Sequence, residues 1–263
     1  MSGSGAALEG RRVLVTGGTS GIGREVVLQA ARQGADVAFC GLEEDLAAEV
    51  RAEVEALGRR CYAEAFDISD LDRTRHFARD AIHALGGLDG LVNNAGANFF
   101  HGMLEATRAD IERCLAVDFY PAWAVSQEAH AALKASRGVV VTVASIHARH
   151  TNPGSFPYNA VKAALVAMAQ SMALEWAPDG IRSLAVAPAL ILSPLAEQYF
   201  DGFGDPAAER ARLEAHYPGG RAGTPADVAA LVAFLLTGAS RFLTGTLIKV
   251  DGGISSLLES PDA

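Results

Sequence analysis

Short apolar runs alternate along the chain with longer stretches in which apolar residues recur every three or four positions. An apolar run bounded by glycine or polar residues is typical of a strand buried on both faces of a parallel sheet. Such runs span residues 12–16, 36–40, 60–66, 88–92, 139–144 and 182–187. Helical patterns fill the intervals: 24–33, 43–57, a helix ending near Leu85, 107–134 with an interruption near Pro121, the stretch from Tyr158, and 227–236. This alternation predicts an α/β fold, a doubly wound parallel sheet with helices on both faces.

The 263 residues contain neither an interdomain linker nor an internal repeat, so we expect a single domain over 1–263. Residues 1–10 are small and polar, which predicts a flexible tail and shows no signal peptide. Residues 194–218 are typical either of an irregular lid over a site or of simple surface helices.

The net charge is −9 with an isoelectric point near 5.2, which argues against a nucleic-acid partner. No apolar run is long enough to span a bilayer, so no membrane association is expected. The histidines show no metal-binding pattern, and no metal is expected. The three cysteines, Cys40, Cys61 and Cys114, are typical of packed thiols in a reducing compartment, and we expect a cytoplasmic protein.

The run at 12–16 leads directly into a glycine-rich turn and then a helix. The glycines are Gly17, Gly21 and Gly23, with Thr19 and Ser20 between them. Glycines let the backbone approach a pyrophosphate, and a helix N-terminus supplies free N–H groups and partial positive charge. Strand, turn and helix in this order predict a dinucleotide site.

A second candidate site combines Tyr158 and Lys162 with Ser145, which follows the buried run at 139–144. Residues four apart lie on one helix face, so the ammonium lies close to the phenol and favours its ionised form. Such a phenol can act as a general base for an alcohol or a general acid for a ketone. The alternative is a surface pair with a packed ring. Only three of the 22 basic residues are lysines, and one of them stands here.

These motifs resemble those of the short-chain dehydrogenase/reductase family. The resemblance rests on Thr16-Gly17, Gly21-Ile22-Gly23, Asn93-Asn94-Ala95-Gly96, Ser145, Tyr158 with Lys162, and Val250-Asp251-Gly252-Gly253, over about residues 10–253. It implies a Rossmann-type sheet of about seven strands, a homotetramer or homodimer, and a lid at 194–218. It also implies that Ser145 binds the reacting oxygen, Tyr158 passes the proton, and Lys162 holds the nicotinamide ribose.

The resemblance further implies cofactor contacts along the carboxyl edge of the sheet. Asp67 and Ile68 would meet the adenine, Asn93 the nearby ribose region, and Ile191 the carboxamide. The full set of expected cofactor-binding residues is Gly17, Thr19, Ser20, Gly21, Ile22, Gly23, Leu42, Asp67, Ile68, Asn94, Ala95, Gly96, Tyr158, Lys162, Pro188, Ile191 and Ser193.

The chain departs from the family pattern at several positions. Asp118 replaces an asparagine of the proton relay, and we include it among the catalytic residues. Gly41 occupies the usual place of the ribose-binding acid, with Leu42 after it. Because a 2′-phosphate needs cations and this region offers none, NAD is the expected cofactor. NADP is the alternative, should Arg11, Arg12 or Arg60 reach the site.

The expected activity interconverts a secondary alcohol and a ketone on a small-molecule substrate. Asn98, His147, Ala189 and Leu190 are expected to line the substrate site, because loops at strand ends build such sites. Polar side chains favour a sugar, polyol or hydroxy acid. A compact cyclic or aromatic alcohol is the alternative, argued from Phe99, Phe100 and Phe156. A cofactor-binding sensor or scaffold without chemistry is the second class of function, and a methyltransferase is a distant third.

Overall fold

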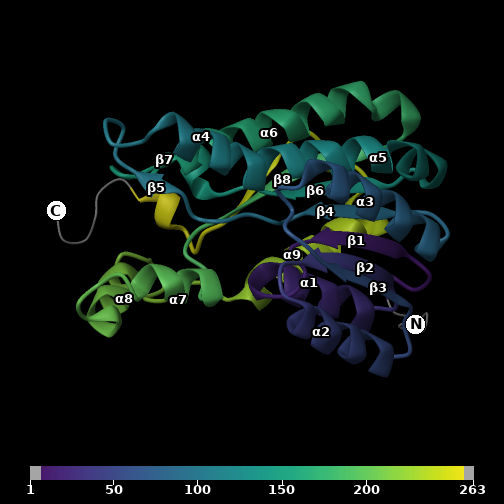
Figure 1. The fold of residues 1–263 in the computed structure, drawn as a ribbon, viewed down its shortest axis with the longest axis horizontal. Helices are drawn as coiled ribbons and strands as arrows, with labels where there is room; N and C mark the ends of the chain where they lie inside the picture. Colours follow the sequence, from purple (N-terminus) through teal and green to yellow (C-terminus); the bar gives the residue numbers. More distant parts are fainter. Residues whose placement is uncertain (1–6, 258–263) are drawn as a thin grey trace.

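The computed structural model of the protein describes residues 7–257 (Figure 1). Its centre is a seven-stranded sheet in the order β3-β2-β1-β4-β6-β8-β9, with every neighbouring pair parallel. The strands are β1 (Arg12–Thr16), β2 (Asp36–Gly41), β3 (Cys61–Ala65), β4 (Gly90–Asn93), β6 (Val139–Val143), β8 (Arg182–Pro188) and β9 (Leu247–Val250). The predicted doubly wound α/β fold is confirmed.

Helices cover both faces of this sheet (Figure 1). On one face lie α1 (Gly21–Arg32), α2 (Glu44–Ala56) and α9 (Pro225–Leu236). On the other lie α3 (Leu71–Leu85), α5 (Tyr120–Ser136) and α6 (Tyr158–Glu175). Successive strand residues alternate between the faces. Val13 and Val15 therefore pack in the α1–α9 core, and Leu14 packs in the core beneath α3 and α5.

Strand β1 pairs with β2 on one side and with β4 on the other. The chain therefore adds β2 and β3 on one side of β1 and the later strands on the other, so the strand order reverses at β1. In open α/β sheets ligands bind outside the carboxyl ends of the strands at such a reversal point. The glycine turn that follows Thr16 lies at this place.

The predicted interruption of the 107–134 helix takes an unexpected form. Helix α4 (Arg108–Cys114), capped by Thr107, continues into a π-helical segment at Leu115–Phe119 and then into α5. Pro121 lies in the first turn of α5, where a missing N–H costs little, and does not break the helix. The irregularity lies at the π-helical turns, which carry Asp118.

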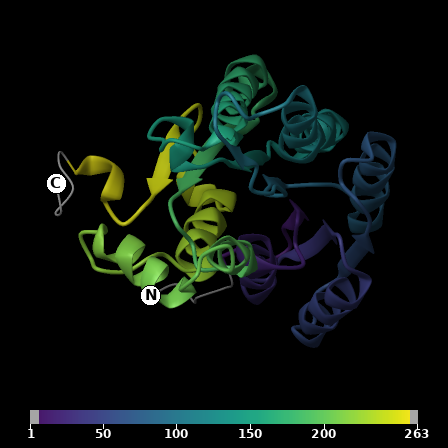
Figure 2. The same cartoon turned by 60° about the vertical axis from the view of Figure 1, so that its left-hand side comes forward.

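Other elements differ from the expectations. Leu8 is fully buried, and its N–H donates to Gln33 O at 2.9 Å, so residues 7–10 are not part of a flexible tail; the rest of the predicted tail, 1–6, lies outside the described residues. Residues 194–218 are not irregular, because they form α7 (Pro194–Phe200) and α8 (Pro206–Ala215). Figure 2 shows these green helices beside the yellow C-terminal segment.

The remaining elements are short. Strands β5 (Phe100–His101) and β7 (Phe156–Pro157) form an antiparallel pair. Single 3-10 turns span Ile146–Ala148, Ala177–Asp179, Gly238–Ser240 and Ile254–Ser256. Within residues 7–257 no helix is long and apolar enough to cross a membrane.

Candidate active site

Tyr158 is the first residue of α6, and Lys162 follows it by one turn on the same face. The ammonium of Lys162 lies 5.2 Å from the centroid of the Tyr158 ring, and the lysine is only 4% exposed. A surface pair would leave the lysine in water. The burial therefore rules out the surface-pair alternative.

Ser145 follows β6 and brings a hydroxyl to the same place. The hydroxyl of Ser145 lies close enough to Tyr158 to lower the pKa of the phenol, and its Oγ accepts the N–H of His147 at 3.2 Å. The parallel register of β6 with β4 and β8 fixes where β6 ends. The sheet thus places Ser145 opposite the start of α6.

Asp118 completes a buried group of charges. Its Oδ2 lies 2.8 Å from Lys162 Nζ, and its side chain is fully buried. Its Oδ1 accepts the N–H of Ala97 at 2.9 Å, which ties it to the chain after β4. The sequence predicted a role beside Lys162, and the structure brings the two together as an ion pair.

The charges of this group act on the phenol in opposite directions. Burial disfavours the phenolate and raises the pKa of Tyr158, Lys162 lowers it, Asp118 raises it, and the Ser145 hydrogen bond lowers it; the net direction is upward. Burial alone would lower the pKa of Lys162, but Asp118 and the phenol together raise it, so the ammonium stays charged. The expected lowering of the phenol pKa by Lys162 is present, but burial and Asp118 outweigh it.

Backbone segments approach one another closely at the glycine turn. A Cβ at Gly23 would lie 1.9 Å from Gly17 O, and one at Gly17 would lie 2.9 Å from Ala95 Cα. Gly17 and Gly21 also have positive φ angles of 68° and 53°. A Cβ at Gly96 would lie 3.0 Å from Lys162 Nζ. Glycine is therefore required at these positions, and the turn packs closely against the chain at Ala95 and Gly96, which leads to Lys162.

Asn94 and Thr16 hold the turn against this chain segment. Asn94 Nδ2 donates to Thr16 O at 3.0 Å and to Gly17 O at 3.1 Å. Thr16 Oγ1 accepts the N–H groups of Asn94 and Ala95. Asn93, by contrast, is buried and donates to Ser126 Oγ at 2.9 Å, so its side chain does not face a ribose site.

Within the turn, Thr19 packs against Gly41. A Cβ at Gly41 would lie 2.1 Å from Thr19 Cγ2, and Thr19 is 8% exposed. Ser20 and Leu42 are exposed, whereas Ile22 and Ile68 are half-buried and pack against the cores. Asp67 Oδ1 accepts the N–H of Ser69, which lowers the pKa of this carboxyl.

The segment after β8 comes back to the glycine turn. Gly223 donates to Leu190 O at 3.0 Å and accepts from Leu192 N–H at 2.9 Å, and neither bond uses the N–H or C=O of Ile191. Leu190 N–H donates to the hydroxyl of Tyr217. Ser193 Cβ lies 3.3 Å from where a Cβ of Gly21 would be, so the start of α7 lies against the turn.

Comparison with known proteins is consistent with this geometry. A family model described as enoyl-(acyl carrier protein) reductase matches residues 17–255. The L-rhamnose 1-dehydrogenase (NAD(P)(+)) of Sphingomonas sp. (strain SKA58) is 35% identical over 250 residues, covering 94% of this chain and 97% of the relative. The chain belongs to the short-chain dehydrogenase/reductase family.

Further relatives of this short-chain dehydrogenase/reductase extend the comparison. A tropinone reductase homologue of Arabidopsis thaliana is 36% identical over 252 residues, covering 95% of this chain and 92% of the relative. A solved structure described as a short-chain alcohol dehydrogenase of Sinorhizobium meliloti 1021 superposes with a TM-score of 0.88 at 30% identity, covering 95% of this chain and 98% of that one. The protein is therefore an enzyme of the NAD(P)-dependent oxidoreductase class.

Two aromatic rings pack edge-on against Tyr158. Phe100 meets the Tyr158 ring edge-on at 5.1 Å between centroids, and His147 does so at 5.8 Å. Tyr199 of α7 contacts Phe100 at 6.1 Å. Burial lowers the pKa of His147, so its ring is neutral at pH 7.

The other expected substrate residues are less concentrated. Asn98, Ala189 and Leu190 are half-buried in the loops after β4 and β8. His101 instead lies 3.7 Å from Asp110, on the far side of β5 from Phe100 in the strand alternation.

Sequence reasoning missed several residues of this site. Thr16, Tyr217 and Tyr199 have roles that depend on contacts between distant segments, and no local pattern marks them. Thr16 had one usable signal, a hydroxyl at the carboxyl end of the first strand.

Proposed function

We propose that the protein interconverts a secondary alcohol and a ketone, with Tyr158 as the acid/base. One observation carries this proposal: the Ser145 hydroxyl and the buried ammonium of Lys162 both act on the phenol of Tyr158. A phenol so placed can exchange a proton with a substrate oxygen, which Ser145 can also contact.

The residues divide the reaction among them. In oxidation, the Tyr158 phenolate takes the alcohol proton as the carbonyl forms, and in reduction the phenol returns that proton to the oxygen. Ser145 Oγ donates a hydrogen bond to the oxygen and fixes its position. Lys162 keeps a positive charge beneath the ring and favours the phenolate. The nicotinamide, when bound, supplies the hydride acceptor or donor.

The residues present fit a dinucleotide. Gly17, Gly21 and Gly23 would hold the pyrophosphate at the N-terminus of α1, where backbone N–H groups are unpaired. Among residues 7–257 the N–H and C=O of Ile191 have no hydrogen-bond partner, and these groups suit a carboxamide. Asp67, Ile68, Asn94, Ala95 and Ser193 keep their proposed places along the same edge of the sheet.

NAD is the preferred cofactor in this proposal. The three arginines that could have reached a 2′-phosphate are engaged at the opposite edge of the sheet. Arg11 and Arg12 bind Asp89, and Arg60 binds Asp36. The region near Gly41 keeps the exposed Leu42 and the acidic Glu43 and Glu44, which supports NAD over NADP.

The proposed substrate is a small polar molecule such as a sugar, polyol or hydroxy acid. The neutral His147 offers a hydrogen bond near Tyr158, and the half-buried Asn98 adds a polar group in the loop after β4. The relative from Sphingomonas is an L-rhamnose 1-dehydrogenase. The aromatic wall of Phe100 and Tyr199 favours a second candidate, a compact cyclic alcohol whose ring packs on it. Helices α7 and α8 would act as the lid, since α7 contacts both Gly21 and Phe100.

The assembly and compartment remain predictions. The resemblance implies a homotetramer or homodimer, which light scattering after size exclusion would measure. All three cysteines are free, as a reducing cytoplasm would require.

A substrate screen tests the function. Sugars, polyols, hydroxy acids and cyclic alcohols are offered with NAD and NADP, and nicotinamide absorbance reports turnover. Turnover only with long apolar alcohols would contradict the polar-substrate proposal. Cofactor binding without turnover of any substrate, together with identical behaviour of Tyr158→Phe, would favour the sensor or scaffold.

A further inference from the structure

A groove of about 390 Å³ lies at the amino edge of the sheet, at the opposite ends of the strands from Tyr158. Its charged lining consists of Arg11, Asp89, Arg137, Arg182 and Arg241. These residues precede or begin β1, β4, β6, β8 and β9, so the sheet order sets them in a row. Four arginines and one aspartate make this groove strongly positive, on a protein whose net charge is −9.

Asp89 does not neutralise the groove. Its Oδ2 lies 2.7 Å from Nε of Arg12, and its Oδ1 lies 3.4 Å from Arg11. The carboxylate is thus shared by two arginines, which together leave a positive charge. The adjoining acid Asp179 contacts Lys134 at 2.7 Å and His130 at 3.0 Å, so it is engaged as well.

Arg182 has a clear structural task. Its guanidinium donates to Leu235 O at 2.9 Å and to Leu243 O at 3.1 Å, which holds the end of α9. Burial and the nearby charge of Arg11 lower the pKa of Arg182, so the two cations lie close enough to repel each other. A bound anion would relieve that repulsion.

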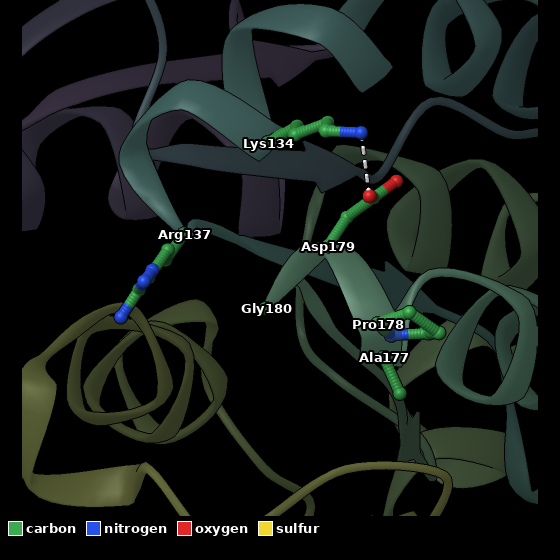
Figure 3. Close-up of a pocket in the computed structure, with 6 residues that line it drawn as sticks. All are labelled: Lys134, Arg137, Ala177, Pro178, Asp179 and Gly180. Carbon is green, nitrogen blue, oxygen red and sulfur yellow. Dashed lines mark ion pairs between the residues drawn. The ribbon is translucent and has the colours of Figure 1, made fainter.

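Arg137 and Arg241 have no such task. Within residues 7–257 neither guanidinium makes a hydrogen bond or an ion pair. Figure 3 shows the Arg137 side chain pointing away from the Lys134–Asp179 pair. The aliphatic part of the Arg137 side chain packs on Gly180. A Cβ added at Gly180 would lie 3.1 Å from Arg137 Cγ. The Arg241 guanidinium lies near Gly238. A Cβ added at Gly238 would lie 3.5 Å from Arg241 Nε.

The backbone of Arg137 adds an independent observation. With φ of 53° it is the one non-glycine residue in the left-handed region among the described residues. This position ends α5, where glycine is the usual residue because it carries no steric cost. An arginine here carries a steric cost, and no hydrogen bond or ion pair of its guanidinium within residues 7–257 compensates for it.

We propose that this arginine groove binds a small anion carrying phosphate groups. The guanidinium fork matches phosphate oxygens two at a time, and the volume suits a molecule of nucleotide size. The carbonyl ends of α5 and α9 also face the groove, and they repel anions. Binding therefore depends on the arginines, above all on the unpaired Arg137 and Arg241.

Inorganic pyrophosphate is the probe, measured by isothermal titration calorimetry at low ionic strength. The double variant Arg137→Gly/Arg241→Ala should bind pyrophosphate at least tenfold more weakly than the wild type does. Arg108→Ala/Arg212→Ala, which removes two exposed arginines of α4 and α8 that do not line the groove, is the matched control and should leave the affinity unchanged. Saturating NADH keeps the probe out of the glycine turn.

Arg137→Gly alone separates binding from structure. Relief of the left-handed conformation should raise Tm without the probe, whereas affinity for pyrophosphate should fall. A lower Tm would show that Arg137 serves the fold and would overturn its assignment. An unchanged affinity in the double variant, or wild-type binding abolished by NADH, would overturn the site.

Discussion

The ion pair between Asp118 and Lys162 predicts a measurable shift in the pH dependence of catalysis. Oδ2 lies 2.8 Å from Nζ, and Nζ lies 5.2 Å from the Tyr158 ring centroid, so Oδ2 is no farther than about 8 Å from that centroid. At an effective dielectric of about 20, two unit charges at that distance interact by roughly 2 kcal/mol. This corresponds to about 1.5 pKa units on the phenol.

Asp118→Asn removes the charge and keeps an oxygen for the N–H of Ala97. Without the carboxylate the pKa of Tyr158 falls, because the phenolate no longer faces a negative charge. The low-pH limb of alcohol oxidation, which needs the phenolate, should move down by about one unit. The high-pH limb of ketone reduction, which needs the phenol, should move in the same direction. Activity at the new optimum should stay within about tenfold.

The assay is kcat/KM against pH in both directions, with Asp179→Asn as a control that removes a remote carboxylate. Loss of one partner from a buried pair also destabilises the fold by about 3–5 kcal/mol, which urea unfolding measures. A limb that stays in place or moves upward would refute the reasoning. It would mean that Lys162 loses its proton once Asp118 is gone.

Four further predictions concern the site. Tyr158→Phe should lower kcat at least about a hundredfold while NADH fluorescence titration shows retained binding, with Tyr120→Phe as the control; near-normal turnover would contradict the mechanism. Gly23→Ala should weaken NAD binding at least tenfold, because its Cβ would lie 1.9 Å from Gly17 O, whereas Gly204→Ala, in open space, should not. Gly41→Ala should destabilise the fold by about 1–3 kcal/mol in urea unfolding, and Thr19→Gly should restore part of that loss. The kcat/KM should favour NAD, and a tenfold advantage for NADP would disprove this.

Much of the fold follows from patterns that are local in the chain. The six predicted runs match six strands. Five of these strands are buried along most of their length, which requires continuous apolar residues, whereas β3 at the edge of the sheet is half-buried and contains Glu64. Strand β9 escaped prediction, since it lies at the edge of the sheet and Lys249 in it is exposed. The π-helical turns around Asp118 also escaped, because hydrophobic periodicity does not distinguish them from an α-helix over five residues.

The site was predictable where motif spacing encodes it and not where tertiary contacts do. Tyr158 and Lys162 are one turn apart on any helix, so their proximity was certain once the helix was. The burial of the Lys162 ammonium could not be predicted in the same way, because its ion-pair partner Asp118 lies in the π-helical segment Leu115–Phe119. The direction of the Asn93 side chain could not be predicted, because the end of a strand does not tell which way a side chain points. The amide is buried and donates to Ser126 of α5.

The balance of charges around Tyr158 also bears on which direction of the reaction is fast near neutral pH. The phenol pKa is raised above its ordinary value, because burial and Asp118 outweigh Lys162 and Ser145. At pH 7 the ring is therefore protonated, which is the form that gives its proton to a ketone oxygen. Oxidation needs the phenolate. As long as the pH is below the pKa, the phenolate fraction grows about tenfold for each unit by which the pH rises. In the proposed mechanism these four residues would favour ketone reduction at neutral pH and alcohol oxidation at alkaline pH. Exchange of Asp118 for asparagine narrows that gap, since it removes the one charge in the group that opposes the phenolate.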